Sequence, residues 1–125
     1  MDCRVEILGA DQPNATDAAD PETISGFSPL WARDMEHCRP WTRMRLPENG
    51  QTNADVAWAS GPAADAPVIL VCGRCPSTMD AAWWFIEAGR MRPWDSLMAV
   101  TQTAGRGQHQ RQWISPAGNI HASWL

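Results

Sequence analysis

The clearest hydrophobic pattern lies in the second half of the chain. Residues 67–73, PVILVCG, form a short apolar run rich in β-branched side chains, which predicts a buried strand. The segment that follows, PSTMDAAWWFIEAG, predicts a helix with Ser77 as its N-cap, Asp80 in its first turn and Gly89 at its end. Four apolar side chains recur there at helical spacing, and we expect this stripe to face the core: Met79, Ala82, Trp83 and Ile86.

Two further strand-like segments follow this helix. Residues 95–102, DSLMAVTQ, predict a second apolar strand, and a third is expected from about Asn119. A loop from about residue 103 to 112 separates them. The predicted order is therefore strand, helix, strand, long loop, strand.

The first half of the chain has a weaker pattern. Residues 9–30 show no sustained period and predict a loop or a poorly ordered arm. Residues 31–46 are interrupted by Pro40 and predict a short helix, a turn and a strand-like piece. The short apolar patch at 56–59 is either a hairpin strand or a loop that packs Trp58. We therefore expect residues 1–66 to be an N-terminal extension of uncertain structure and residues 67–125 to be the N-terminal part of the domain proper.

The composition bounds the possible partners. A chain of 125 residues, 44% hydrophobic and 19% charged, is typical of one globular domain. Its net charge of −4 argues against nucleic acid as a partner. Residues 1–66 carry a net charge of −6 and residues 67–125 a net charge of +2, so an anionic ligand is expected in the second part. All ten basic residues are arginine, so a mechanism that needs lysine cannot be completed by this chain.

Neither a targeting segment nor a membrane span is predicted. The N-terminus lacks a basic region followed by an apolar stretch, and no apolar run approaches the roughly 20 residues that cross a bilayer. The four cysteines are too few and too scattered for a secreted disulfide scaffold. We expect a cytoplasmic protein with reduced thiols and no membrane partner.

The loop AGRGQHQRQW carries the most chemistry. Gly105 and Gly107 let the backbone approach a ligand closely, and Arg106 and Arg111 suit phosphate or carboxylate oxygens. Trp113 would anchor the loop or stack on a flat ligand. By itself this composition favours a flexible surface hairpin with two solvated arginines, because G-x-G is a common pattern. The segment is neither a Walker loop, which needs lysine, nor a dinucleotide-binding fingerprint, which needs a third glycine and a helix.

The cysteines, the histidines and the remaining tryptophans give weaker functional signals than the loop. Cys72 and Cys75 have the spacing of half a zinc site or of a redox pair, and His37 and Cys38 would complete a four-ligand zinc site. The favoured interpretation is that the two cysteines are small buried residues at a turn and bind no metal. His109 is at best a weak phosphate-side contact, and His121 is expected to be structural. The remaining tryptophans are expected to fill the core or an interface: Trp83, Trp84, Trp94 and Trp124.

Taken together, these motifs resemble a known family. The chain has Ser77-Thr78 at a helix start, then Gln102-x-Ala-Gly-Arg-Gly, Arg111-x-Trp113, Ser115-Pro-x-Gly-Asn119 and Ser123. In order and spacing, this string resembles the catalytic domain of biotin protein ligases over about residues 68–125, nearly half of the chain.

The resemblance implies a fold and a reaction. The fold would be α+β, a mixed sheet with packed helices like that of class II aminoacyl-tRNA synthetases, biotin ligases and lipoate ligases. Such a protein activates biotin with ATP and Mg²⁺ as biotinyl-AMP, and transfers biotin to a lysine of a biotin carboxyl carrier protein. Biotin would be held by Ser77, Thr78 and Gln102. A closing loop would cover biotin and the acyl phosphate, and it would consist of Gly105, Arg106, Gly107 and Gln108. Arg111 and Trp113 would lie on the nucleotide side of this loop. Arg106 and Arg111 would be the catalytic residues.

The chain departs from the family pattern at several points. Met79 replaces the usual Asn after Ser-Thr, Gln108 replaces an Arg of the loop, and Gln110 replaces a Gly. The family's catalytic lysine has no counterpart, because the chain contains no lysine. We therefore expect a truncated ligase fragment that is catalytically incomplete by itself. Its expected partner is a C-terminal polypeptide that complements it. The alternatives are a lipoate or octanoate ligase or transferase relative, an inactive fragment or binding module, and a small zinc domain.

Overall fold

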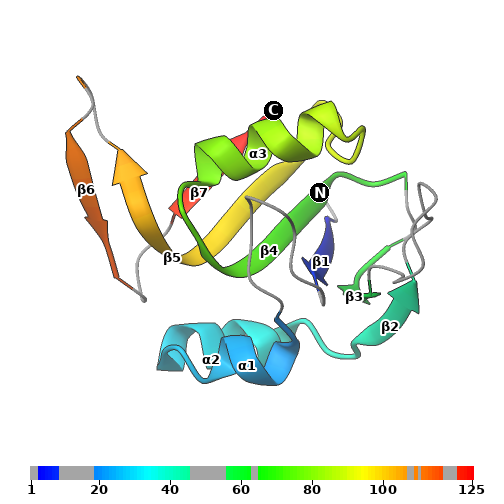
Figure 1. The fold of residues 1–125 in the computed structure, drawn as a ribbon. Coiled ribbons are helices and arrows are strands. Elements are labelled where there is room, and N and C mark those ends of the chain that lie inside the picture. Colours follow the sequence, from blue (N-terminus) through cyan, green and yellow to red (C-terminus); the bar gives the residue numbers. More distant parts are fainter. Residues whose placement is uncertain are drawn as a thin grey trace.

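One mixed sheet organises the part of the chain that the structure, a computed structural model, describes: residues 3–8, 19–45, 56–62, 65–106, 109, 111–116 and 121–125. The strand order is β2-β3-β1-β4-β5-β6, and β7 pairs with β5 as well (Figure 1). The strands are β1 (Arg4–Leu8), β2 (Thr42–Arg45), β3 (Val56–Ser60), β4 (Val68–Cys75), β5 (Ser96–Arg106), β6 (Gln112–Ser115) and β7 (His121–Trp124); the helices are α1 (Pro21–Ser25), α2 (Pro29–His37) and α3 (Thr78–Glu87).

The centre of the sheet is parallel and its flanks are antiparallel. β4 runs parallel to β1 and to β5, whereas β3 is antiparallel to β1 and β2 to β3. α3 connects the parallel neighbours β4 and β5, as a parallel pair requires a crossover. The predicted class, α+β with a mixed sheet and packed helices, is confirmed at this level.

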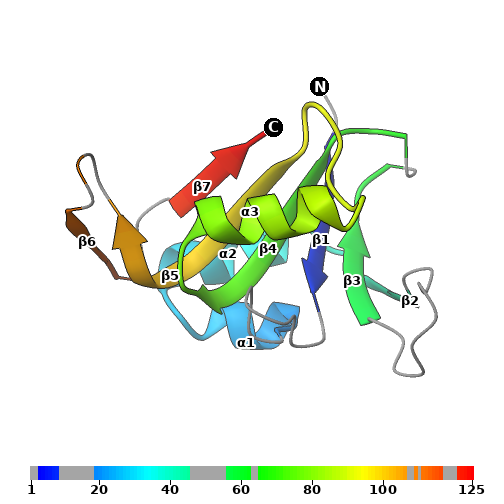
Figure 2. The same cartoon turned by 45° about the horizontal axis from the view of Figure 1, so that its top comes forward.

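The two faces of the sheet are covered by different helices. α1 and α2 lie on one face and α3 on the other, as Figures 1 and 2 show. Because side chains alternate along a strand, Ile7 and Val71 pack on the α1–α2 side, whereas Leu8 and Leu70 pack on the α3 side. The sheet is thus buried on both faces, which explains why β4 is a continuous apolar run.

Two short strands share the outer edge of β5. β7 pairs with its first half, from Ser96 to Ala99, and β6 pairs with its second half, from Gln102 to Arg106. The register shifts between Gln102 and Gly105, which marks a bulge. β6 and the end of β5 project away from the rest of the molecule (Figure 1).

The N-terminal segment contributes to the same sheet. β1 lies between β3 and β4, so the boundary expected at residue 66 falls inside the sheet. The expectation of a loop over residues 9–30 is wrong at its end, because α1 forms there and α2 begins at Pro29; residues 9–18 lie outside the described residues. The helix, turn and strand expected over 31–46 are confirmed by α2 and β2, and the patch at 56–59 is a strand, β3.

The predicted helix α3 is confirmed, but its predicted buried stripe is correct only for Ala82 and Ile86 and wrong for Met79 and Trp83. Ser77 is its N-cap and Gly89 follows its end with a positive φ of 72°. The buried helix side chains are Thr78, Ala81, Ala82 and Phe85, whereas Met79 and Trp83 are 52% and 59% exposed. Apolar residues occur all round this helix, so periodicity alone does not decide which side meets the sheet.

The predictions for the other tryptophans and for the loop after residue 103 are only partly correct. Trp84 packs partly against the core. Trp94 and Trp124 are 83% and 75% exposed, so a core position is wrong for them and an interface role stays a prediction. The loop expected from residue 103 begins later, because β5 continues to Arg106, and β6 was not predicted. β7 confirms the third strand. None of the helices in the described ranges has the length and apolar character to cross a bilayer.

Candidate functional site

The predicted biotin-binding residues gather at the start of α3. Ser77 and Thr78 are 4% and 5% exposed, and Ser77 has the extended backbone of an N-cap residue. Its side chain makes no capping hydrogen bond. Instead, the backbone N–H of Thr78 donates to Oε1 of Gln102, at 2.8 Å. A side chain of β5 therefore caps α3 in place of the serine.

Strand register brings Gln102 to this position. Gln102 lies opposite Cys75, the last residue of β4, and β4 leads directly into α3. The backbone N–H of Ala104 also donates to the carbonyl oxygen of Pro76, at 2.8 Å. These contacts fix the turn between β4 and α3 against β5.

A third segment reaches the same point. Ser123, on β7, donates its hydroxyl hydrogen to Oγ1 of Thr78, at 3.0 Å. β7 is placed there by its antiparallel pairing with the first half of β5. We call Thr78, Gln102, Arg106 and Ser123 the α3 polar cluster. Its members come from α3, β5 and β7, and Thr78 is hydrogen-bonded to residues that are 24 and 45 positions away in the sequence.

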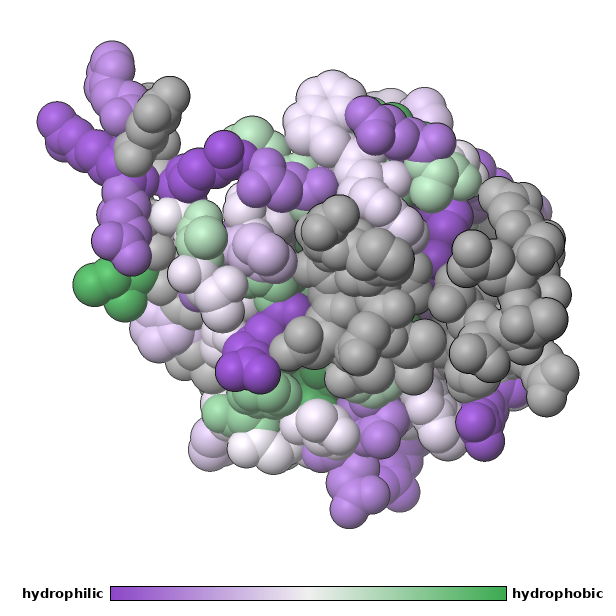
Figure 3. All heavy atoms as spheres, viewed as in Figure 1, coloured by the Kyte–Doolittle hydropathy of each residue, from purple (hydrophilic) through white to green (hydrophobic). Residues whose placement is uncertain are grey.

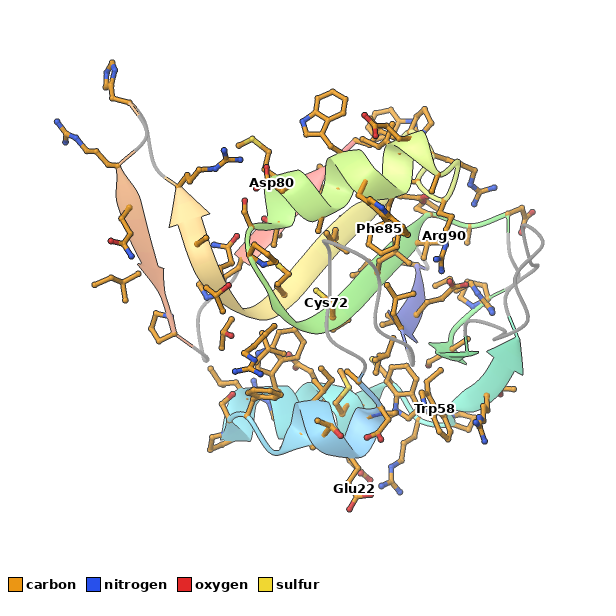
Figure 4. All side chains as sticks on the ribbon, viewed as in Figure 1. Glu22, Trp58, Cys72, Asp80, Phe85 and Arg90 are labelled. Carbon is orange, nitrogen blue, oxygen red and sulfur yellow. The ribbon has the colours of Figure 1, made fainter. Side chains whose placement is uncertain are left out.

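Arg106 is held by a partner that the sequence did not indicate. Its guanidinium pairs with Oδ1 of Asp80, in the first turn of α3, and both side chains are 48% exposed. Figure 4 shows Asp80 at the end of α3 that lies nearest the tip of β5. The only sequence signal for this pair is an acid in the first turn of a helix, a pattern that the helix dipole alone explains.

The remaining loop residues are only partly described. Gly105 is buried in β5 and lies opposite Trp113, whose side chain is outside the described residues, as are Gly107 and Gln108. Arg111 is exposed and immediately precedes Gln112, the register partner of Arg106. Arg111 thus lies further out on the hairpin than Arg106. Hydrophilic side chains gather on this projecting hairpin (Figure 3).

A hollow beside the α3 polar cluster was also missed by sequence reasoning. It has a volume of about 460 Å³ and is lined by Pro76, Asp80, Trp83, Trp84 and Glu87. The half-exposed Trp83 gives it an aromatic wall next to the Asp80–Arg106 pair. A flat or apolar ligand group could therefore lie against α3 while its anionic group meets Arg106.

The cysteines and histidines do not gather into a metal centre. Cys72 and Cys75 are both buried, and Sγ of Cys72 donates to the carbonyl oxygen of Met98, at 3.5 Å. Within the described ranges, no three or more His, Cys, Asp or Glu side chains are arranged to hold a metal ion. His121 is buried, and its Nε2 donates to the carbonyl oxygen of Pro116, at 2.9 Å. His109 is exposed, with a positive φ of 57°.

The α3 polar cluster lies where ligands commonly bind in sheets with parallel strands. It stands at the carboxyl ends of β4 and β5, next to the start of the connecting helix. Hydroxyl and amide groups suit a neutral polar head, and the guanidinium suits a carboxylate or phosphate. Comparison with known proteins adds no relative, because no family model, curated protein or solved structure matches the chain.

Proposed function

We propose that this chain binds biotin and biotinyl-AMP at the α3 polar cluster and serves as the acyl-binding part of a biotin–protein ligase. One observation supports this proposal above the others. Positions of the family string that are distant in sequence, Thr78, Gln102 and Ser123, are joined by hydrogen bonds, and Arg106, on β5, pairs with Asp80 in the helix turn that Thr78 begins. A string matched only by chance would not be expected to converge in this way.

The chemistry of the cluster fits the two ends of such a ligand. The ureido ring of biotin is neutral and needs both hydrogen-bond donors and acceptors, which buried hydroxyl groups provide. The acyl phosphate formed with ATP and Mg²⁺ is anionic, and Arg106 offers it a planar donor fork. Arg111 and Trp113, further along the hairpin, would act on the nucleotide side.

The chain does not contain every group that the family reaction uses. The reaction ends with transfer of biotin to a lysine of a biotin carboxyl carrier protein, and the family's own catalytic lysine has no equivalent in this lysine-free sequence. We therefore propose a binding role completed by a second, lysine-bearing polypeptide.

A second candidate ligand is favoured by one side chain. Met79 is 52% exposed directly after Thr78, where the family usually has a polar Asn. An exposed thioether next to the cluster favours an aliphatic chain, so lipoate or octanoate, with the corresponding ligase or transferase activity, is the alternative. Competition between biotinyl-AMP and lipoyl-AMP analogues separates the two.

Calorimetric titration with a non-hydrolysable biotinyl-AMP analogue tests the proposal. We expect saturable binding by the wild type, and about tenfold or greater weakening in Arg106→Ala, because a charge-assisted hydrogen bond to the ligand is lost. Arg33→Ala is the matched control, since Arg33 is an exposed arginine of α2 on the opposite face of the sheet.

Three results bear on the outcome. Weakening in Arg106→Ala with unchanged affinity in Arg33→Ala supports the proposal. Absence of saturable heat from a chain whose circular dichroism shows the folded state contradicts it. Equal weakening in both arginine variants would also contradict it, because the ligand would then be responding only to overall charge.

A further inference from the structure

A second cavity lies on the other face of the sheet, away from the α3 polar cluster. It has a volume of about 780 Å³, within the range of small-molecule sites. None of the predicted biotin-site residues lines it. Its lining comes from α1, α2, β3 and the segments beside them: Asp20, Pro21, Glu22, Ser25, Met35, Glu36, Arg39, Pro40, Trp41 and Trp58.

The cavity has aromatic and apolar walls that are already held in place. Trp41 donates its indole N–H to the carbonyl oxygen of Met35, at 3.0 Å. The side chain of Met35 is 4% exposed, and Trp41 and Trp58 are partly buried against the same core cluster. Figure 4 shows Trp58 on the side of the sheet that carries α1 and Glu22. A ligand would therefore meet preformed walls and would not have to order them.

The charged groups around the cavity are mostly acidic. Asp20, Glu22 and Glu36 line it, and Arg39 is its only lining cation. Arg39 is paired with Glu36, its Nε lying 3.0 Å from Oε2. Asp20 accepts the backbone N–H of Thr23 at its Oδ1, at 2.7 Å. Glu22 is exposed and forms no ion pair with any residue of the described ranges.

These features together select the charge of a ligand. Two tryptophan faces attract a cation through their quadrupoles, and the excess of two carboxylates over the single guanidinium adds to that attraction. The same field repels an anion. Arg43 lies opposite Trp58 in the strand register, but it does not line the cavity.

We propose that this cavity binds a small organic cation with an apolar body, such as an aromatic or alkylated amine. The cationic nitrogen lies near Glu22 at the rim, and the apolar body lies against Trp41, Trp58 and Met35. This site is independent of the biotin proposal, because the two share no lining residue and prefer ligands of opposite charge.

Three probes of equal size but different charge test this proposal: phenethylammonium, the neutral 2-phenylethanol and the anionic phenylacetate. The readout is the two-dimensional nuclear magnetic resonance spectrum of the labelled full chain, in which the indole N–H groups of Trp41 and Trp58 report binding. We expect saturable shifts of these two signals with phenethylammonium, several-fold weaker binding of 2-phenylethanol, and no saturable shift with phenylacetate.

Matched carboxylate variants complete the test. Glu22→Gln should weaken phenethylammonium about threefold, in keeping with one exposed charge, and Glu87→Gln, an exposed acid of α3, should not change it. The dispersed spectrum shows in the same experiment that each variant is folded. Equal binding of phenylacetate and phenethylammonium overturns the proposal, as does an equal effect of the two variants or the absence of saturable shifts at Trp41 and Trp58.

Discussion

Arg106 is paired with Asp80 in the structure, and under the proposed function an anionic ligand would compete with Asp80 for the same guanidinium. In the structure its guanidinium pairs with Asp80, and each side chain is 48% exposed. A half-exposed ion pair is screened by water and contributes at most about 1 kcal/mol. A ligand carboxylate or phosphate can therefore replace Asp80 at small cost.

Removing the carboxylate of Asp80 should strengthen binding of an anionic ligand. In Asp80→Asn we expect the affinity for the biotinyl-AMP analogue to rise about twofold to fivefold, because Arg106 loses its competing partner. Titration at two salt concentrations checks this, and the gain should shrink at the higher one. Glu22→Gln, at an exposed acid of α1 on the opposite face of the sheet, controls for net charge. Weaker binding in Asp80→Asn would show that Asp80 helps to hold the ligand.

Cys38 has an environment that favours its neutral thiol. Burial, and then the negative charge of Asp34, raise the pKa of Cys38 above its ordinary value of 9.0. Because the folded state holds this proton more tightly than the unfolded state, the contribution to stability is full below pH 9.0 and is lost as the pH rises further.

This pKa predicts slow alkylation of Cys38. At mildly alkaline pH we expect iodoacetamide to modify Cys38 more slowly in the folded chain than in the urea-unfolded chain, because less thiolate is present. Asp34→Asn should speed the reaction, since it removes one of the two causes of the raised pKa. Peptide mass spectrometry measures both rates. Equal rates in wild type and Asp34→Asn would show that access alone controls reactivity.

Among the elements, β4 and β5 are joined at their amino ends by one buried carboxylate. Asp95 is 2% exposed; its Oδ1 accepts the backbone N–H of Val68 at 2.8 Å, and its Oδ2 accepts that of Arg92 at 2.9 Å. The carboxylate thus ties the start of β4 to the turn that leads into β5. A buried donor that loses its acceptor costs about 1–3 kcal/mol.

Asp95→Ala should therefore destabilise the fold strongly. We expect the free energy of unfolding to fall by about 3 kcal/mol, because two backbone N–H groups lose their acceptor at once. Urea denaturation measures this change. Asp65→Ala, at an exposed turn, should stay within about 0.5 kcal/mol of the wild type. A loss of similar size in both variants would show that the Asp95 carboxylate is not the cause.

The same elements show what local sequence patterns predict and what they leave open. The run at β4 and Gly89 predicted a strand and a helix end correctly, because these signals act within a few residues. Ser77 marked the start of the helix correctly, but Gln102 supplies the capping hydrogen bond. The buried face of α3 was not predicted, since Phe85 and Met79 are both apolar and only the sheet selects between them. β1 was missed because its alternate positions, Arg4 and Glu6, are polar and are partly buried as an ion pair at 2.7 Å.

For the whole molecule, the sheet and the candidate site depend on contacts between distant segments. The sequence pattern alone gave no reason to place β1 between β3 and β4. The family string did select Thr78, Gln102, Arg106 and Ser123, because their order and spacing are specific even though each part is common. It did not identify Asp80 as the partner of Arg106, because that pair links residues 26 positions apart.

The lysine-free composition leads to a last prediction for the whole chain. Adenylate formation builds negative charge on the transferring phosphoryl group, which in biotin protein ligases, the family that the sequence resembles, is met by a lysine as well as by arginines. This chain supplies only arginines, and all ten of its basic residues are of that type. It should therefore bind biotinyl-AMP without forming it.

Biotin-dependent exchange of labelled pyrophosphate into ATP measures this step directly. We expect no exchange by the pure chain above the level of the Arg106→Ala variant, while a complete biotin protein ligase under the same conditions gives a clear signal. Exchange by the wild-type chain that is lost in Arg106→Ala would show that arginine alone can support adenylate formation here. A lysine-bearing partner would then no longer be needed. The proposal that biotin binds at the α3 polar cluster would gain support.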